Sequence, residues 1–194
     1  MLHLSLLATL VAEASDEWTV LQVDQVHVQC RDLSDGSGSE CVAVARIDAE
    51  VQPVSDILRD LPSWPRRFDN VVNTVLLGPV GQDDLYAIDI RLPWPLGSRS
   101  MVARVHHSDD GDGHHEVVVQ AIDGDMLWTR ASWEIYAVGE QTEIAYRWHT
   151  EALANLPGWI RRSFLRRTGH HVMWGLALAA QSKPEAPPEP RLGG

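Results

Sequence analysis

The sequence predicts an α+β domain with one antiparallel β-sheet, two short helices after the second strand and one long C-terminal α-helix. Three observations carry this prediction. Stretches of alternating apolar and polar residues recur between glycine- and aspartate-rich turns, as is typical of antiparallel strands. A proline-bounded apolar segment follows the second of these stretches, and a long run with helical spacing comes last.

Composition limits the function classes. The chain has 194 residues, enough for one domain with a sizeable core, and a formal net charge of -11. A chain with this much negative charge is not expected to be a general nucleic-acid binder. No zinc ribbon, P-loop or GxGxxG loop occurs, so we predict neither a cofactor nor a metal.

The two ends of the chain are expected to lie outside the folded domain, which we place at residues 15–181. Residues 1–14 resemble a signal peptide, because an apolar run too short to span a bilayer precedes Ala12-Glu13-Ala14, a small-x-small cleavage site. This predicts a periplasmic or secreted protein. The positive n-region is missing, so a helix packed on the domain, with a cytoplasmic location, is the alternative. Residues 182–194 predict a disordered Pro/Gly-rich tail.

The first predicted strands are Val20–Cys30 and Cys41–Val51, joined by the turn Asp35–Ser39. The two cysteines flank this hairpin loop, and in simple register they lie nearly opposite each other. In an oxidising compartment this geometry permits a disulfide worth about 2–3 kcal/mol. In a cytosolic protein Cys30 and Cys41 would instead stay two reduced, buried thiols.

The middle of the chain is predicted to form two short helices followed by six strands. Pro53–Leu61 has apolar residues at helical spacing, and Ser63–Asn70 follows as a second short helix after a proline break. The remaining predicted strands are Val71–Val80, Leu85–Leu92, Arg99–Val105, Glu116–Ile122, Arg130–Val138 and Thr142–Thr150. In the third of these, Arg99 shares a face with apolar residues. It therefore needs an inward partner or a wet cavity, or it reaches back to solvent.

The last helix is predicted to begin near Asn155 and to run to about Gln181. Its apolar stripe consists of Ile160, Phe164, His171, Gly175 and Leu178. Near its start lies a basic cluster, Arg161, Arg162, Arg166 and Arg167. This cluster has two interpretations, a transient contact with an anionic membrane surface or a solvated helix face paired with local acids.

The residues between the two central strands carry a family resemblance. Pro93–Leu96 reads PWPL and Gly97–Ser100 reads GSRS. This segment resembles the central motif of START (StAR-related lipid-transfer) domains, within the helix-grip superfamily that includes polyketide cyclases and birch-pollen-allergen-like proteins. START domains often follow PWPL with Ser-Asp-Arg-Asp; here the arginine is kept and both acids are serine. The order of predicted elements extends the resemblance over Trp18–Gln181.

The resemblance implies a helix-grip fold, in which a curved sheet wraps around the last helix and leaves a cavity for a ligand. It implies binding, or transport, of a lipid or other apolar small molecule by a monomer. The ligand-binding candidates are Tyr86, Ile88, Arg99, Met101, Trp133, Tyr146, Trp148, Phe164, His171 and Trp174. Alternating apolar residues also fill an ordinary core, and an interaction module with a filled core is a further alternative.

Enzymatic activity stays open at this point, with binding favoured. The alternative is an enzyme of the polyketide cyclase or dehydratase type, for which Arg99, Tyr146 and His171 would be the residues to suspect. No nucleophile–base–acid set is visible, and we predict no catalytic residue. The histidine pairs 106–107 and 114–115 flank the turn Ser108–Gly113 and could meet across it. Neighbours on a strand point to opposite faces, however, so we predict no functional metal site.

Overall fold

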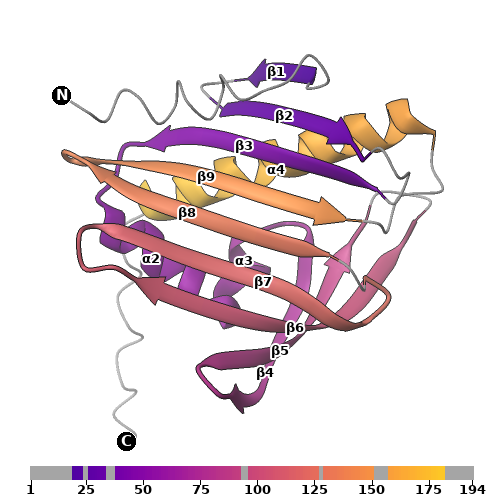
Figure 1. Cartoon of the computed structure of the whole chain (residues 1–194), viewed down its shortest axis with the longest axis horizontal. Helices are drawn as coiled ribbons and strands as arrows, with labels where there is room; N and C mark the ends of the chain where they lie inside the picture. Colours follow the sequence, from indigo (N-terminus) through magenta and orange to yellow (C-terminus); the bar gives the residue numbers. More distant parts are fainter. Residues whose placement is uncertain are drawn as a thin grey trace, which may run out of the picture.

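One sheet organises the protein. The computed structural model describes residues 19–23, 26–33, 38–92, 96–126, 129–150 and 157–181. Within these residues nine strands form one antiparallel sheet in the order β1-β2-β3-β9-β8-β7-β6-β5-β4. The sheet curves around α4, and α2, α3 and α4 all lie on its one side (Figure 1). The predicted α+β helix-grip architecture is confirmed.

The strands are β1 (Thr19–Val23), β2 (Val26–Asp32), β3 (Ser39–Ile47), β4 (Val71–Val80), β5 (Asp83–Arg91), β6 (Ser98–Asp109), β7 (His114–Gly124), β8 (Arg130–Val138) and β9 (Gln141–Thr150). The helices are α2 (Val51–Arg59), the 3-10 turn η1 (Leu61–Ser63), α3 (Trp64–Arg67) and α4 (Gly158–Gln181). The short helices thus follow the second predicted strand, as expected. No helix of the described ranges is long and apolar enough to cross a membrane.

The predicted first strand, Val20–Cys30, is wrong in one respect. It is two strands, because β1 pairs antiparallel with β2 and Val23 lies opposite Val26. In the sequence only one common turn residue, Asp24, separates the two strands, and no glycine, proline or asparagine accompanies it, so the turn signal is weak. Residues 1–14, residues 182–194 and the corner Pro93–Pro95 lie outside the described residues.

Cys30 and Cys41 lie opposite each other in the β2–β3 register. They form a disulfide with a Cα–Cα distance of 4.1 Å, and both side chains are fully buried. The predicted bridge is therefore confirmed. It links two neighbouring strands beneath α4, which packs on both β2 and β3.

The core lies between the concave face of the sheet and the helices, a region that we call the interior. It joins Ile88, Ile135 and Ile144 of the sheet with Leu58 of α2 and Leu176 of α4, all at most 1% exposed. These residues belong to one continuous cluster. The interior is therefore shaped by one face of the sheet and by α4 together.

Helix α4 turns a different face inward from the one predicted. Its buried residues are Leu165, Gly169, Val172, Met173 and Leu176, whereas Ile160, His171 and Leu178 of the predicted stripe are exposed. The physical reason is that apolar residues occur around most of this helix, so several stripes fit a period of 3.6. Packing on the sheet selects among them, and the helix sequence alone does not.

Candidate ligand-binding interior

Six of the predicted ligand-binding residues line the interior. Tyr86, Ile88 and Met101 come from β5 and β6, and all three are buried. Trp133, Tyr146 and Trp148 come from β8 and β9 and are also buried; we call these last three the aromatic wall. Strand register brings the partners together, since Ile88 lies opposite Met101 and Trp133 opposite Tyr146. All six belong to the single core cluster.

The aromatic wall is a stack of three rings. The ring centroids of Trp133 and Tyr146 are 4.7 Å apart, and those of Tyr146 and Trp148 are 4.5 Å apart, with interplanar angles of 15° and 16°. From the helix side, Trp64 of α3 packs against Trp133 in a T-shaped arrangement, with their ring centroids 5.5 Å apart. Burial raises the pKa of Tyr146 far above its usual value, so the phenol stays neutral. The wall therefore presents an uncharged aromatic surface.

Two polar atoms of the aromatic wall lack partners. The Nε1 atoms of Trp133 and Trp148 are buried and have no hydrogen-bond partner in the described part of the structure. Trp64 differs, since its Nε1 donates to the carbonyl oxygen of Ile57 at 3.2 Å. Buried indole N–H groups usually find an acceptor. The wall thus carries two hydrogen-bond donors whose capacity is unused.

Helix α4 covers the aromatic wall at Gly169. A Cβ atom at this position would overlap the ring of Trp148, so only glycine allows the helix to lie this close. Phe164, another predicted ligand-binding residue, is half-buried and packs against the core cluster from the same helix. The role of Gly169 could not be predicted from the sequence, because a glycine within a helix gives no sign of what lies opposite it.

The three remaining candidates lie away from the aromatic wall. The half-buried Arg99 donates from Nη1 to the backbone oxygen of Ser98 at 3.0 Å. His171 and Trp174 are exposed on α4, Trp174 at 47%. Trp174 instead lines an open groove of about 570 Å³ with Leu178 and, from the sheet, Val26 and Ile47. His171 belongs to the predicted stripe of α4, whose face is exposed here, whereas Arg99 keeps the strand parity of the buried Met101.

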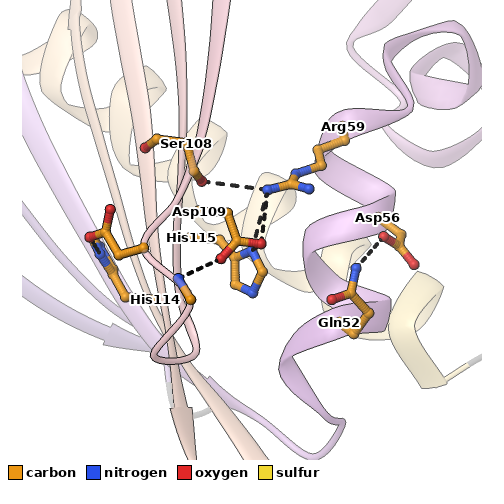
Figure 2. Close-up of polar contacts among 9 residues, drawn as sticks. Gln52, Asp56, Arg59, Ser108, Asp109, His114 and His115 are labelled. Atoms are coloured by element: carbon orange, nitrogen blue, oxygen red, sulfur yellow. Dashed lines mark hydrogen bonds and ion pairs between the residues drawn. The ribbon is translucent and has the colours of Figure 1, made fainter.

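His114 and His115, beside the β6–β7 turn, each contact an aspartate side chain. Figure 2 shows Arg59 of α2 reaching toward His115 and Asp109, with its Nη2 3.3 Å from His115 Nδ1 and 3.8 Å from an Asp109 oxygen. The same Nδ1 is 3.3 Å from Asp109, so it either accepts from Arg59 or donates to Asp109. His114 pairs with Asp110 at 2.7 Å. No group of three metal-ligating side chains gathers in the described ranges.

The basic cluster at the start of α4 meets an acid. Arg161 and Arg162 contact the carboxylate of Asp32 at 2.9 and 2.6 Å, and Ser39 donates to it at 2.7 Å. Burial acts to raise the pKa of Asp32, but the hydrogen bonds from Ser39 and Arg161 and the two arginine charges outweigh it and lower the pKa. For these two arginines the structure matches the interpretation of a helix face paired with local acids.

The comparisons with known proteins identify the fold. No family model matches the chain. Uncharacterized protein PA1579 of Pseudomonas aeruginosa is 24% identical over 167 residues, which cover 78% of this chain and 81% of that protein. Among solved structures, a STAR-related lipid transfer protein from Xanthomonas axonopodis has a TM-score of 0.72 at 18% identity, covering 86% of this chain and all of that one.

Two further solved structures share the fold, one a lipid transfer protein and the other an aromatase/cyclase. Human StAR-related lipid transfer protein 5 has a TM-score of 0.75 at 13% identity, with 92% of this chain and 93% of that chain covered. Zhui aromatase/cyclase from Streptomyces sp. R1128 has a TM-score of 0.59 at 10% identity, with coverages of 73% and 93%. At these identities the likeness concerns the fold, and it confirms that the chain is folded as START domains are.

Proposed function

We propose that this chain, which has the fold of START domains, binds a lipid or another apolar small molecule in its interior. The observation that carries the proposal is the aromatic wall, a stacked, uncharged surface on the concave face beneath α4. Burying apolar ligand surface against such a wall is favourable by about 25 cal/mol per Å². The lipid transfer proteins with the same fold add support by analogy.

The proposed binding residues are those that share the interior. They are Tyr86, Ile88, Met101, Trp133, Tyr146, Trp148 and, at its margin, Phe164. Arg99, His171 and Trp174 stay outside this set, since one contacts its neighbour's backbone and two are exposed. The ligand's apolar part would therefore meet neutral side chains only.

A substitution that fills the interior tests the proposal. Ile88→Trp is expected to weaken binding of a fluorescent acyl or sterol probe at least tenfold, because the larger ring takes the ligand's space. Ala87→Trp is the matched control, since the neighbouring residue points to the opposite face of β5. Melting curves verify that both variants fold. Unchanged probe binding by a folded Ile88→Trp variant would contradict binding in the interior.

The alternative function is an enzyme of the polyketide cyclase or dehydratase type, supported by the fold shared with the aromatase/cyclase. The residues that such chemistry would use do not converge. Tyr146 is buried and neutral, Arg99 contacts Ser98, and His171 is exposed on α4. We therefore favour binding. Turnover of a poly-β-keto substrate by the purified protein would reverse this preference.

We also propose a periplasmic or secreted location. The disulfide supports it, because such bonds persist mainly in oxidising compartments. Fractionation of the source cells followed by intact-mass measurement tests the proposal. Loss of residues 1–14 from the exported protein is the expected result, and a cytoplasmic protein that retains them would contradict it.

Contact with an anionic membrane stays a prediction. Asp32 already contacts Arg161 and Arg162, so charge reversal there would also disturb the fold. Arg167→Glu, at an exposed position of α4, is the cleaner variant. Vesicle co-sedimentation should weaken with this variant and with added salt. Equal sedimentation with neutral and anionic vesicles would remove the prediction and leave interior binding untouched.

A further inference from the structure

We infer that the ligand presents a neutral oxygen acceptor, as in an ester, a ketone or a hydroxyl group, to the indole N–H groups of Trp133 and Trp148. The inference rests on the proposed function and names the chemical class of the ligand. Its basis is that both side chains are more than nine-tenths buried, at 4% and 5% exposure, and that neither Nε1 has a partner in the described residues.

Packing on both sides limits how far either indole can rotate toward an acceptor among the described residues. Trp133 is enclosed between Tyr146, which stacks on it, and the edge of Trp64. Trp148 lies between Tyr146 and the backbone of α4 at Gly169. Both N–H groups are therefore held in fixed directions on one wall. Since the described residues supply no acceptor, we assign that role to the ligand.

The chemistry of the aromatic wall limits which kinds of ligand group can accept these hydrogen bonds. An indole N–H only donates, so a protonated amine or a hydrocarbon offers it no acceptor. The wall itself consists of two indoles and a phenol kept neutral by burial, without a cation. A carboxylate buried there would lack a counter-charge, which is strongly unfavourable. The geometry thus points to an uncharged apolar molecule that carries a carbonyl, ester or hydroxyl oxygen.

A matched ligand pair tests the inference. Methyl dodecanoate and tridecane have similar apolar surface, but only the ester accepts hydrogen bonds. Competition against a fluorescent apolar probe should show the full-length protein binding the ester roughly tenfold more tightly, which corresponds to about 1.4 kcal/mol. Protonated dodecylamine should bind no better than tridecane.

Conservative variants test whether Trp133 and Trp148 cause the preference for the ester over tridecane. Trp133→Phe and Trp148→Phe keep an aromatic ring and remove the N–H, so each should reduce the ratio of ester affinity to tridecane affinity several-fold, whatever happens to tridecane affinity itself. Trp174→Phe is the control, because this tryptophan is exposed on α4 and should keep the full preference. The removed N–H groups have no hydrogen-bond partner among the described residues, so both wall variants should melt near the wild-type temperature without ligand.

A spectroscopic readout covers the case of a variant that fails to fold. In wild-type protein with ¹⁵N-labelled tryptophan, the ester should shift two of the eight indole N–H signals downfield and tridecane should not. Equal affinity for ester and tridecane, with no such shifts, overturns the inference and leaves apolar binding intact. Failure to bind either compound or the probe instead contradicts the proposed function itself.

Discussion

Gly169 is the residue at which α4 comes closest to the aromatic wall. Gly169→Ala should destabilise the protein by about 1–3 kcal/mol, because the added methyl overlaps Trp148 in a packed core. Helix propensity opposes this loss by only about 1 kcal/mol. Urea unfolding measures the net effect. Ser163→Ala, at an exposed position of the same helix, is the control and should stay within about 0.5 kcal/mol.

His107 should make stability depend on pH. Its pKa is lowered from the ordinary 6.5, mainly by burial and also by Arg59, while Asp84 acts in the opposite direction. The unfolded chain then binds a proton more readily than the folded one. The contribution of His107 is therefore complete above pH 6.5 and is lost as the pH falls from there through the folded pKa.

Denaturant unfolding of wild type and of His107→Gln at several pH values tests whether His107 causes this pH dependence of stability. Wild type should lose more stability than the variant between about pH 7.5 and about pH 5.5. The groups that face His107 are Arg59, Asp84 and His106, and they stay in place in the variant. Parallel stability profiles for the two proteins would contradict the assignment to His107.

At the scale of the element, Asp32 ties the start of α4 to the end of β2. Asp32→Asn should weaken both arginine contacts, and amide hydrogen exchange in the first two turns of α4 should accelerate. The pair is partly exposed, so we expect a loss of only about 1 kcal/mol in the free energy of unfolding. Arg31 and Glu40, a neighbouring surface ion pair, provide the control: Glu40→Gln should leave α4 exchange unchanged.

The same contact has a defined pH response. Because the folded pKa of Asp32 lies below the ordinary 3.8, its contribution is complete above that pH and is lost as the pH falls further. Salt should also weaken it, since the charges are partly exposed. Exchange rates in α4 that are the same for wild type and Asp32→Asn would show that the contact does not anchor the helix.

At the scale of the whole molecule, the disulfide should contribute to global stability. The bridge spans a separation of 11 residues between two buried strands. Removing it with Cys30→Ala and Cys41→Ala together should cost about 2–3 kcal/mol in urea unfolding. The double variant also removes buried volume, so reduction of the wild-type protein is the matched comparison. No change in midpoint after verified reduction would contradict the prediction.

Much of the fold could be predicted because its strands follow period two and its helices begin near prolines. The β1–β2 reversal was missed, since Asp24 without a neighbouring glycine or proline is a weak turn signal within an alternating apolar run. For the candidate site, strand parity placed Tyr86, Ile88 and Trp133 correctly. The helical period placed His171 on a face of α4 that is exposed, because α4 is apolar on several faces and only packing on the sheet selects one. The unused indole donors depend on three-dimensional neighbours that no sequence pattern reveals.

The pairing of β3 with β9 has a kinetic consequence. Ser39 lies opposite Thr150, so the middle of the sheet joins segments more than a hundred residues apart in the chain. At a synthesis rate of roughly 5–20 residues per second, β3 therefore waits on the order of 5–20 s for its partner. Contacts this distant also favour folding in the range of about milliseconds to seconds. The β2–β3 hairpin is local and can form early. Once the Cys30–Cys41 bridge closes in an oxidising compartment, it holds β3 paired with β2 until β9 adds to it.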